Sequence, residues 1–360
     1  MSVVFLCLKI ECMFLGSDIV ITVENLKKEY KLVKRDPGLK GAIKSLFNRK
    51  YETKHAVKGI NFTIEQGETV GYIGANGAGK STTIKMLTGI LTPTSGKVTV
   101  NGLVPYENRQ KNAVNIGAVF GQRTQLFWDI PVRESYNLLK HIYEIPEQEY
   151  QETVEMFTEV LTLEPLLGIP VRQLSLGQKM RCELAAAFLH RPKVVYLDEP
   201  TIGLDIAVKV KIRKFIKEMN QRWGTTVLLT THDMQDIEEI CDRIIIIDGG
   251  TILYDGGLEQ IKKQFGQQRV IHFELADKEK FELPASLIGQ AEVLPNEEET
   301  KVSLSFDHET VKSSFVISEM MSMYEIGDLN IADPKIETIV EELYNKQEQG
   351  GEHEKVLANS

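Results

Sequence analysis

Cysteine is scarce in this sequence, and its spacing argues against two classes of protein. The 360 residues include four cysteines, Cys7, Cys12, Cys182 and Cys241, with no paired spacing of the kind that metal ligands show. Disulfide-stapled secreted domains carry many more cysteines in a shorter chain. We therefore expect reduced thiols in a cytosolic protein.

Long hydrophobic runs are also lacking. The apolar stretch Val3–Leu8 has no basic start and is too short to span a bilayer, and nowhere else do 18 apolar residues follow one another. If the protein works at a membrane, another chain must cross it. Met13 lies just before the first predicted strand, so residues 1–17 are expected to be a disordered tail or a misassigned start. Residues 347–360 are expected to form a second disordered tail.

The composition is that of an ordinary soluble globular protein, with 42% hydrophobic and 26% charged residues. The formal net charge of −9 is unevenly placed, because the segment from Gln268 to the end has 20 acidic and 8 basic residues. An acidic segment of this kind argues against a nucleic-acid-binding surface there. No nucleic-acid partner is expected.

The stretch from Gly74 to Ser81 has the pattern G-x-x-x-x-G-K-[ST] of a phosphate-binding loop. An apolar run, Thr69–Ile73, predicts a buried strand before it, and apolar residues at helical spacing follow. Lys80 would bring a positive charge to the outer phosphates, and Ser81 a hydroxyl ligand to Mg²⁺. Nucleotide contacts are expected from Gly74, Ala75, Asn76, Gly77, Ala78, Gly79, Lys80, Ser81 and Thr82.

Two acidic residues end another apolar strand, Val194–Leu197. Asp198, at the carboxyl end of this strand, would face the phosphates and hold Mg²⁺ through water. Glu199 follows directly and could act as the base for an attacking water. A solvated acidic turn is the simpler interpretation of these residues alone, but the upstream phosphate loop favours a catalytic one.

A second helix start with anion-binding character lies between these motifs, in Leu174–Gln178. Ser175 is a natural N-cap, and Gly177 permits close backbone approach to a ligand. The positive end of the helix dipole would point at whatever lies before Ser175.

Strands and helices alternate over most of the chain, which indicates an α/β fold with a parallel sheet covered on both faces. Beyond the strands already named, the pattern predicts an edge strand over 18–26 that ends at Tyr30, and a strand pair, 56–64 and 69–73, joined by a turn. Residues 131–167 read as helical, and 116–120, 226–230 and 243–248 as strands. From about Val270, short strands (270–275, 301–306) and two helices (309–323, 334–346) predict a small α+β module.

In this order the motifs resemble those of the ATP-binding subunit of an ABC transporter, over roughly residues 18–265. Gly74–Ser81 is similar to Walker A, Leu174–Gln178 to the signature motif, and Val194–Asp198 to Walker B, with Glu199 placed as the catalytic glutamate. The remaining matches are Gln122 to the Q-loop, Gly203–Asp205 to the D-loop, His232 to the switch histidine and Tyr30 to the aromatic residue that stacks on adenine.

The resemblance implies an ABC-type P-loop nucleotide-binding domain over 18–265, with a helical subdomain at about 122–180. Its cofactors would be ATP and Mg²⁺, the metal held by Ser81, Gln122 and Asp198. Glu199, His232 and Gln122 would be catalytic. Two copies would close head to tail on two ATP molecules, so that Ser175, Gly177, Gln178 and Asp205 would complete the site of the partner copy.

The sequence departs from the family pattern at three places. Leu176 stands where glycine is usual, and Thr201-Ile202 where Ser-Ala is common. A basic insertion over residues 31–55 separates Tyr30 from the next strand, so Tyr51 and His55 are alternatives for adenine stacking. Within it, residues 39–47 form either a solvated surface segment or an amphipathic helix on a membrane surface or a membrane partner.

The finer resemblance is to the ATPases of ABC-2-type exporters, which export drugs, antibiotics or polysaccharides through two separate permease subunits. The chain would then lie at the cytoplasmic face of the membrane. Phe127-Trp128-Asp129 would receive a permease helix, although Trp128 fits a core position equally well. Residues 268–346 resemble the accessory C-terminal module of such ATPases, which would support dimerisation or regulation.

Other functions remain open. A soluble ABC ATPase acting on ribosomes or DNA usually has two ATPase domains in one chain or a long coiled coil, and neither occurs here. A non-transport role in signalling or immunity, and import in place of export, are compatible with the same motifs. The transported substrate is not encoded in any residue pattern that we can identify.

Overall fold

The computed structural model describes residues 19–34, 50–121, 124–265, 268–276, 281–295, 300–332, 336–341 and 343–344. It divides into two compact units, Met1–Asp255 and Gly256–Ser360. Gln122 and the segment 39–47 lie outside the described residues. Of the helices within the described ranges, none has the length and apolar character needed to cross a membrane.

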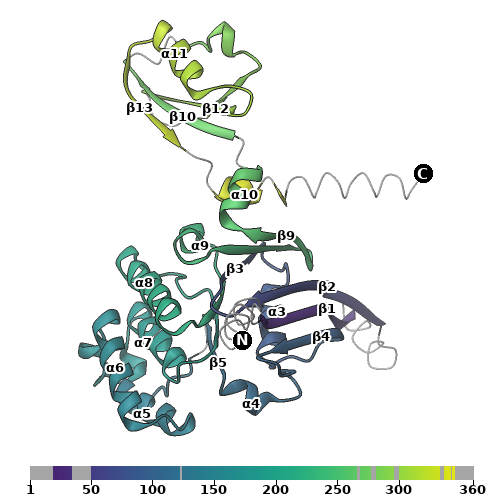
Figure 1. Cartoon of the computed structure of the whole chain (residues 1–360), viewed down its shortest axis with the longest axis vertical. Helices are drawn as coiled ribbons and strands as arrows, with labels where there is room; N and C mark the ends of the chain where they lie inside the picture. Colours follow the sequence, from purple (N-terminus) through teal and green to yellow (C-terminus); the bar gives the residue numbers. More distant parts are fainter. Residues whose placement is uncertain are drawn as a thin grey trace, which may run out of the picture. The chain divides into compact units, whose positions relative to one another are not determined.

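A six-stranded sheet forms the centre of the first unit (Figure 1), with the strand order β5-β6-β7-β3-β8-β9. Its members β5, β6, β7, β3 and β8 pair in parallel. The interior strands are buried on both faces, and Ile244–Ile247 are fully buried, which explains their continuous apolar sequence. The strands are β3 (Thr69–Gly74), β5 (Ile116–Phe120), β6 (Val194–Asp198), β7 (Thr226–Thr230), β8 (Arg243–Asp248) and β9 (Thr251–Gly257).

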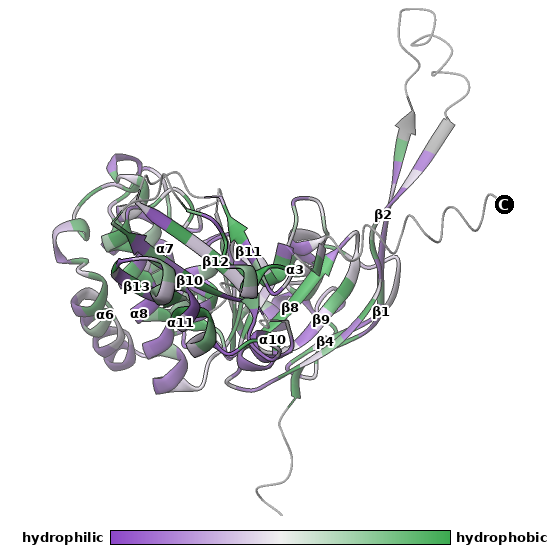
Figure 2. Ribbon diagram, turned by 90° about the horizontal axis from the view of Figure 1, so that it is seen from above, coloured by the Kyte–Doolittle hydropathy of each residue, from purple (hydrophilic) through white to green (hydrophobic). Residues whose placement is uncertain are grey.

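A second, antiparallel sheet in this unit has the order β2-β1-β4, formed by β2 (Lys50–Glu65), β1 (Ile19–Lys34) and β4 (Ser95–Val100). The strands β1 and β2 continue beyond β4 as a two-stranded ribbon (Figure 2). The first strand therefore does not end at Tyr30, as the sequence suggested, because cross-strand pairing extends it to Lys34.

The predicted pairing of 56–64 with 69–73 across a turn is wrong. β2 pairs with β1, whereas β3 lies between the parallel strands β7 and β8 of the other sheet. Both edges of β3 are thereby occupied, so the turn at 66–68 passes the chain from one sheet to the other.

Helices of the first unit gather mainly on the side away from the three-stranded sheet, where α5 to α8 lie (Figure 1). The aromatic rings of Phe157, Phe188 and Phe215 join α6, α7 and α8 by edge-to-face contacts. The helices are α3 (Lys80–Leu87), α4 (Arg109–Ala113), α5 (Val132–Ile142), α6 (Glu147–Leu161), η1 (Glu164–Leu166), η2 (Val171–Gln173), α7 (Leu176–Phe188), α8 (Ile206–Trp223) and α9 (Met234–Ile240).

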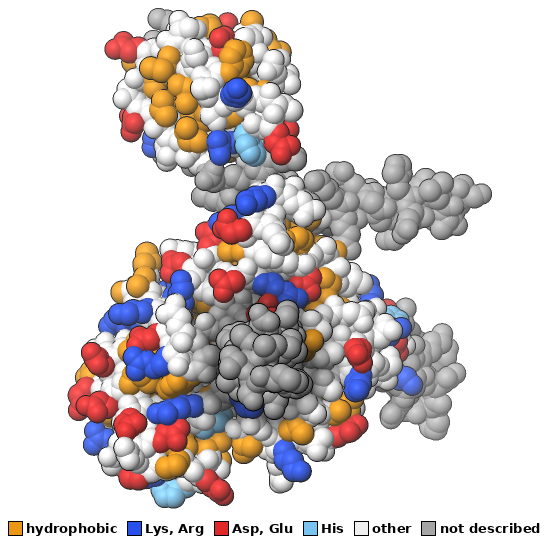
Figure 3. Space-filling model, in the orientation of Figure 1, with side chains coloured by type: hydrophobic (Ala, Val, Ile, Leu, Met, Phe, Trp, Pro, Cys, Tyr) orange, Lys and Arg blue, Asp and Glu red, His pale blue; other side chains and the backbone are white. Residues whose placement is uncertain are grey.

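The second unit is a four-stranded antiparallel sheet, in the order β11-β12-β10-β13, with its own apolar core. Helix α10 belongs to this unit, whereas the sequence places it before the domain boundary. Apolar side chains gather on the face of the unit seen in Figure 3. Met321 and Met323 are exposed side chains of this unit. Its elements are α10 (Leu258–Phe265), β10 (Gln268–Leu275), η3 (Ala285–Leu287), β11 (Ala291–Leu294), β12 (Lys301–Asp307), α11 (Ser313–Met323) and β13 (Ile326–Ala332).

Candidate nucleotide-binding and catalytic site

The loop between β3 and α3 has the backbone that the phosphate-loop pattern predicts. Gly77 and Gly79 have φ angles of 87° and 114°, which disfavour any residue with a side chain. A Cβ at Gly79 would also lie 2.6 Å from the carbonyl oxygen of Ala56, so glycine allows close packing there. The N-terminus of α3 follows at Lys80, and no side chain caps it. The first N–H groups of a helix have no partner within the helix, so this end of α3 suits an anion.

Lys80 lies over this loop. Its ammonium donates hydrogen bonds to the carbonyl oxygens of Gly74 and Ala75. Burial lowers the pKa of Lys80, against the opposing charges of Glu199 and Asp198. The side chain is 8% exposed, so its charge acts in a partly desolvated environment where electrostatic interactions are strong.

The side chains of Ser81 and Asp198 meet at the carboxyl end of the sheet. The Ser81 hydroxyl donates to Asp198 Oδ2 at 3.3 Å, and Thr230 donates to Asp198 Oδ1 at 2.6 Å. The two oxygens of Ser81 and Asp198 are of the kind that Mg²⁺ prefers, and they lie next to the phosphate loop. The donor set therefore fits this ion.

Glu199 and His232 form the next pair, with 3.2 Å between Glu199 Oε1 and His232 Nε2. Burial raises the pKa of Glu199, while His232 and Lys80 oppose this shift. The φ angle of Glu199 is 58°, a left-handed conformation that is unfavourable for a residue with a side chain. Its backbone N–H donates to the carbonyl of Thr230 at 3.0 Å, which holds it against β7.

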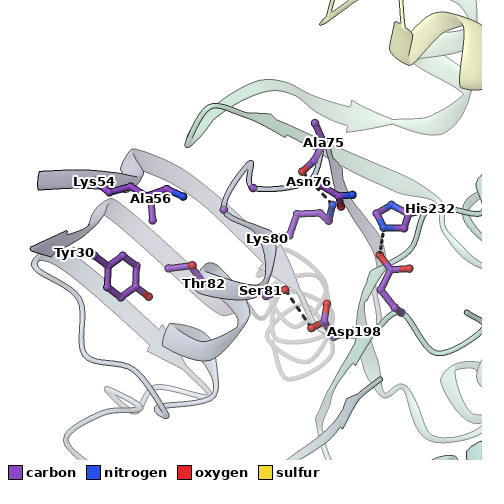
Figure 4. A pocket seen from close by; sticks show the side chains of 13 residues that line it. Tyr30, Lys54, Ala56, Ala75, Asn76, Lys80, Ser81, Thr82, Asp198 and His232 are labelled. Atoms are coloured by element: carbon purple, nitrogen blue, oxygen red, sulfur yellow. Dashed lines mark hydrogen bonds and ion pairs between the residues drawn. The ribbon is translucent and has the colours of Figure 1, made fainter. Parts of the chain in front are cut away.

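These groups line one pocket of about 350 Å³, a size suited to a nucleotide (Figure 4). Tyr30 lies at one end of it in this view and His232 at the other, with Ser81 and Lys80 between them. The lining residues are Tyr30, Lys54, Ala56, Ala75, Asn76, Gly77, Gly79, Lys80, Ser81, Thr82, Asp198, Glu199 and His232. The predicted residues Gly74 and Ala78 shape the loop without lining this pocket.

Tyr30 lines the pocket, but neither of its alternatives does so among the described side chains. His55 instead pairs with Glu29 at 3.2 Å, and the side chain of Tyr51 lies outside the description. Lys54 is a lining residue that the sequence did not single out. No sequence pattern marks it, because Lys54 pairs with Tyr30 only through the β1–β2 register of the folded chain.

The predicted residues of the signature and D-loop segments lie apart from this pocket. Ser175 caps α7 in a reciprocal capping box with Gln178, and Asp205 caps α8 by accepting from the Val208 N–H at 2.9 Å. Neither these residues nor Gly177 belong to the pocket lining. The side chains of Ser175, Gln178 and Asp205 form hydrogen bonds with backbone N–H groups at the N-termini of their own helices.

The segment after Gln122 is anchored by a residue that the sequence did not reveal. Glu183 of α7 accepts hydrogen bonds from the Thr124 hydroxyl and from the Gln125 N–H, the latter at 3.1 Å. Burial raises the pKa of Glu183, and these hydrogen bonds oppose the shift. An acid on a helix gives no sequence signal for such a contact, because its partner lies 58 residues away.

Comparisons with known proteins agree with this geometry. A family model described as "ABC transporter" matches residues 57–202. The linearmycin resistance ATP-binding protein LnrL of Bacillus subtilis (strain 168) is 31% identical over 80% of this chain and 93% of its own length. This chain belongs to the ABC transporter ATP-binding proteins. The ABC transporter ATP-binding protein NatA of the same organism is also 31% identical, over 60% of this chain and 87% of its own.

Solved structures of this family share the fold. A dimeric ATP-binding cassette in a post-hydrolysis state, bound to ADP and Pi, is 27% identical with a TM-score of 0.54, over 66% of this chain and 98% of its own. An ATP-binding subunit of an ABC transporter is 25% identical with a TM-score of 0.58, over 69% and 93%. The predicted family, the predicted α/β fold and the predicted ATP hydrolase activity are confirmed. The chain is an ATP-binding ABC transporter subunit.

Proposed function

We propose that this ABC ATPase works as a dimer in which two ATP molecules lie between the phosphate loop of one copy and the signature helix of the other. The observation that carries the proposal is the separation of the two motifs within one chain. Ser175 starts a helix at the surface, but it does not line the pocket that contains Lys80. A helix N-terminus supplied by a second copy would complete charge neutralisation around the outer phosphate.

In this proposal Glu199 takes the proton of the attacking water, whose oxygen bonds to the outer phosphorus while the bond from that phosphorus to the bridging oxygen breaks and ADP leaves. His232 orients Glu199 through the contact at 3.2 Å. Lys80 exchanges its contacts with the loop carbonyls for the phosphates. Mg²⁺ held by Ser81 and Asp198, with Gln122, would add positive charge beside the same phosphates. Loss of the outer phosphate removes the group that joins the two copies, so the dimer opens.

We further propose that dimer opening and closing drives export through two separate ABC-2-type permeases, with the chain at the cytoplasmic face of the membrane. The name of the relative LnrL, a resistance ATP-binding protein, supports this direction. Phe127 and Trp128 are 43% and 53% exposed just after the Q-loop position, which fits a permease contact better than a core role. The C-terminal unit is proposed to be an accessory module for dimerisation or regulation.

The test begins with Glu199→Gln, which removes the base but keeps the shape of the side chain. With ATP and Mg²⁺ this variant should form a stable dimer, and without ATP it should stay monomeric, as measured by light scattering after size exclusion. Addition of Gly177→Asp should prevent this dimer, because a carboxylate would then face the phosphates.

Gly168→Asp is the matched control for Gly177→Asp. Gly168 is exposed and has open space where a Cβ would lie, and a Cβ at Gly177 would make only ordinary contacts. Both variants should therefore fold, and only Gly177→Asp should block the dimer. If both variants dimerise equally, the signature helix does not complete the ATP site.

Membranes containing candidate permeases then decide the transport role. A trapped dimer that co-purifies with two permease subunits supports the exporter function. A trapped dimer without any membrane partner contradicts it and favours a role outside transport.

A further inference from the structure

A buried polar network includes sequence neighbours of Glu199 and His232, and its centre is Asp236 of α9. This carboxylate is fully buried. Its Oδ2 accepts hydrogen bonds from the hydroxyls of Thr201 and Thr231, the latter at 3.0 Å. Its Oδ1 accepts from Arg213 Nε at 2.5 Å. One side chain thus joins the segment after β6, the end of β7 and helix α8.

Arg213 extends the network along α9. Besides Asp236, its guanidinium donates to Asp233 Oδ2 at 3.3 Å and to Glu239 Oε1 at 3.0 Å. Lys209, one turn earlier on α8, donates to the same Asp233 oxygen at 2.6 Å. Partial burial raises the pKa of Asp233, but the hydrogen bond from Lys209 and the charge of Arg213 outweigh it and lower the pKa overall.

The members of this network flank the two proposed catalytic residues in the sequence. Thr201 is two residues after Glu199, and Thr231 and Asp233 are the immediate neighbours of His232. The Thr231 hydroxyl also accepts the backbone N–H of Asp233 at 3.0 Å, so the chain is tied on both sides of His232. None of these flanking residues lines the nucleotide pocket.

We propose that the hydroxyls of Thr201 and Thr231, joined through Asp236 and Arg213, are positioning groups that keep Glu199 and His232 in contact for ATP hydrolysis. The inference rests on the proposed catalytic roles of these two residues. It adds residues that touch neither nucleotide nor metal and act through the backbone on either side of the catalytic pair.

Two observations favour positioning over simple stabilisation. Buried charge pairs are costly to desolvate, and apolar residues of similar volume would often hold two helices equally well. In addition, Glu199 has a left-handed φ of 58°, a conformation that persists only when its surroundings hold it. Thr201 is 1% exposed, and its hydroxyl, bonded to Asp236, ties down the chain just beyond this strained residue.

The test uses Thr201→Val and Thr231→Val in the full chain, because valine keeps the volume of threonine and removes only the hydroxyl. Turnover and KM for ATP are measured at saturating Mg²⁺, together with thermal unfolding. We expect kcat to fall roughly tenfold or more in each variant, since small displacements of catalytic groups are costly, with ATP affinity nearly unchanged. Thr201→Ser restores the hydroxyl and should restore kcat.

Thr225→Val is the matched control. Thr225 is also 1% exposed and donates one buried hydrogen bond, to the carbonyl of Pro192 at 3.1 Å, but it lies at the opposite end of β7 from Thr231. Thr225→Val should lose stability, though no more than the other two variants because its acceptor is a neutral carbonyl, and its kcat should not fall. Equal kcat in all three valine variants, or losses of kcat that simply follow the loss of thermal stability, would overturn the proposal.

Glu199→Gln and His232→Ala, measured in parallel, separate this inference from the proposed function. If both abolish turnover while Thr201→Val and Thr231→Val do not, the network inference alone fails. If Glu199→Gln hydrolyses ATP at the rate of the natural sequence, the proposed catalytic roles are wrong. The positioning inference then fails as well, because it depends on those roles.

Discussion

The two halves of the proposed ATP site differ in how far a single chain completes them. On the phosphate-loop side, Ser81 contacts Asp198 and Glu199 contacts His232, although these residues come from three separate stretches of sequence. On the signature side, Ser175 and Gln178 contact mainly each other. The first side is a pocket assembled by the fold, and the second is a capped helix end at the surface.

The difference between the phosphate-loop side and the signature side shows which contacts one chain makes by itself and which would need a second copy. In the positioning proposal, the network around Asp236 holds the proposed catalytic residues Glu199 and His232 before any partner arrives, because Asp236 accepts hydrogen bonds from their neighbours Thr201 and Thr231. The signature side instead exposes apolar residues, since Leu176 is 51% exposed and Ile206 is 80% exposed. Apolar exposure beside a capped helix is typical of a surface that a partner covers.

The largest effect expected on the phosphate-loop side comes from Lys80→Ala. Lys80 is the ammonium closest to the loop carbonyls, so its loss should weaken ATP binding to the isolated chain and reduce hydrolysis by at least about 10²-fold. Equilibrium binding of a fluorescent ATP analogue and phosphate release measure the two effects. Lys111→Ala removes an exposed lysine from α4 and should change neither. Full ATP affinity in Lys80→Ala would mean that the loop amides bind the phosphates alone.

An intermediate effect, confined to the signature side, is expected from Ile206→Ser. Covering an isoleucine side chain contributes about 1.5–3 kcal/mol, so the ATP-trapped dimer of Glu199→Gln should dissociate roughly tenfold or more readily. ATP binding by the monomer and its thermal stability should stay unchanged, because the side chain is 80% exposed. Sedimentation of the dimer at several concentrations measures the shift.

Val114→Ser provides the control for Ile206→Ser, since Val114 is 53% exposed at the end of α4. It should leave the dimer intact. Equal weakening by both substitutions would show that general surface hydrophobicity, and not the D-loop region, promotes association.

The same comparison explains what the sequence could predict. The phosphate loop, Asp198 and Glu199 follow from short local patterns, because a strand, a glycine loop and a helix start place these groups by themselves. Continuous apolar strands such as 243–248 likewise predicted the parallel sheet. These features depend on neighbours in the sequence, and the structure places Asp198 at the end of β6 and Glu199 directly after it, both lining one pocket with the phosphate loop. The binding and catalytic roles of these residues stay predictions.

Features that depend on pairing between distant residues were not predicted. The assignment of β2 and β3 to different sheets, the extension of β1 to Lys34 and the position of Lys54 in the pocket all follow from the β1–β2 register. The links from Asp236 to Thr201 and from Glu183 to Thr124 join residues 35 and 59 positions apart. No local pattern marks such partners, because an acidic residue on a helix looks the same in the sequence whether or not it contacts a distant residue.

The smallest effect expected is at the base end of the pocket, from Tyr30→Ala. Tyr30 is proposed to stack on adenine, and loss of one stacked ring costs about 1 kcal/mol, or roughly fivefold in ATP affinity.

Tyr30→Phe keeps the ring and should bind ATP normally. Competition by inorganic tripolyphosphate, which has no base, should be the same in all three proteins, because the proposed phosphate contacts come from Lys80 and the loop amides. If Tyr30→Ala weakened tripolyphosphate as much as ATP, the residue would act through the shape of β1 and not by stacking. Tyr30 of β1 and Lys54 of β2 are cross-strand partners. This result would therefore mean that the pairing of β1 with β2 determines the shape of the pocket at its base end.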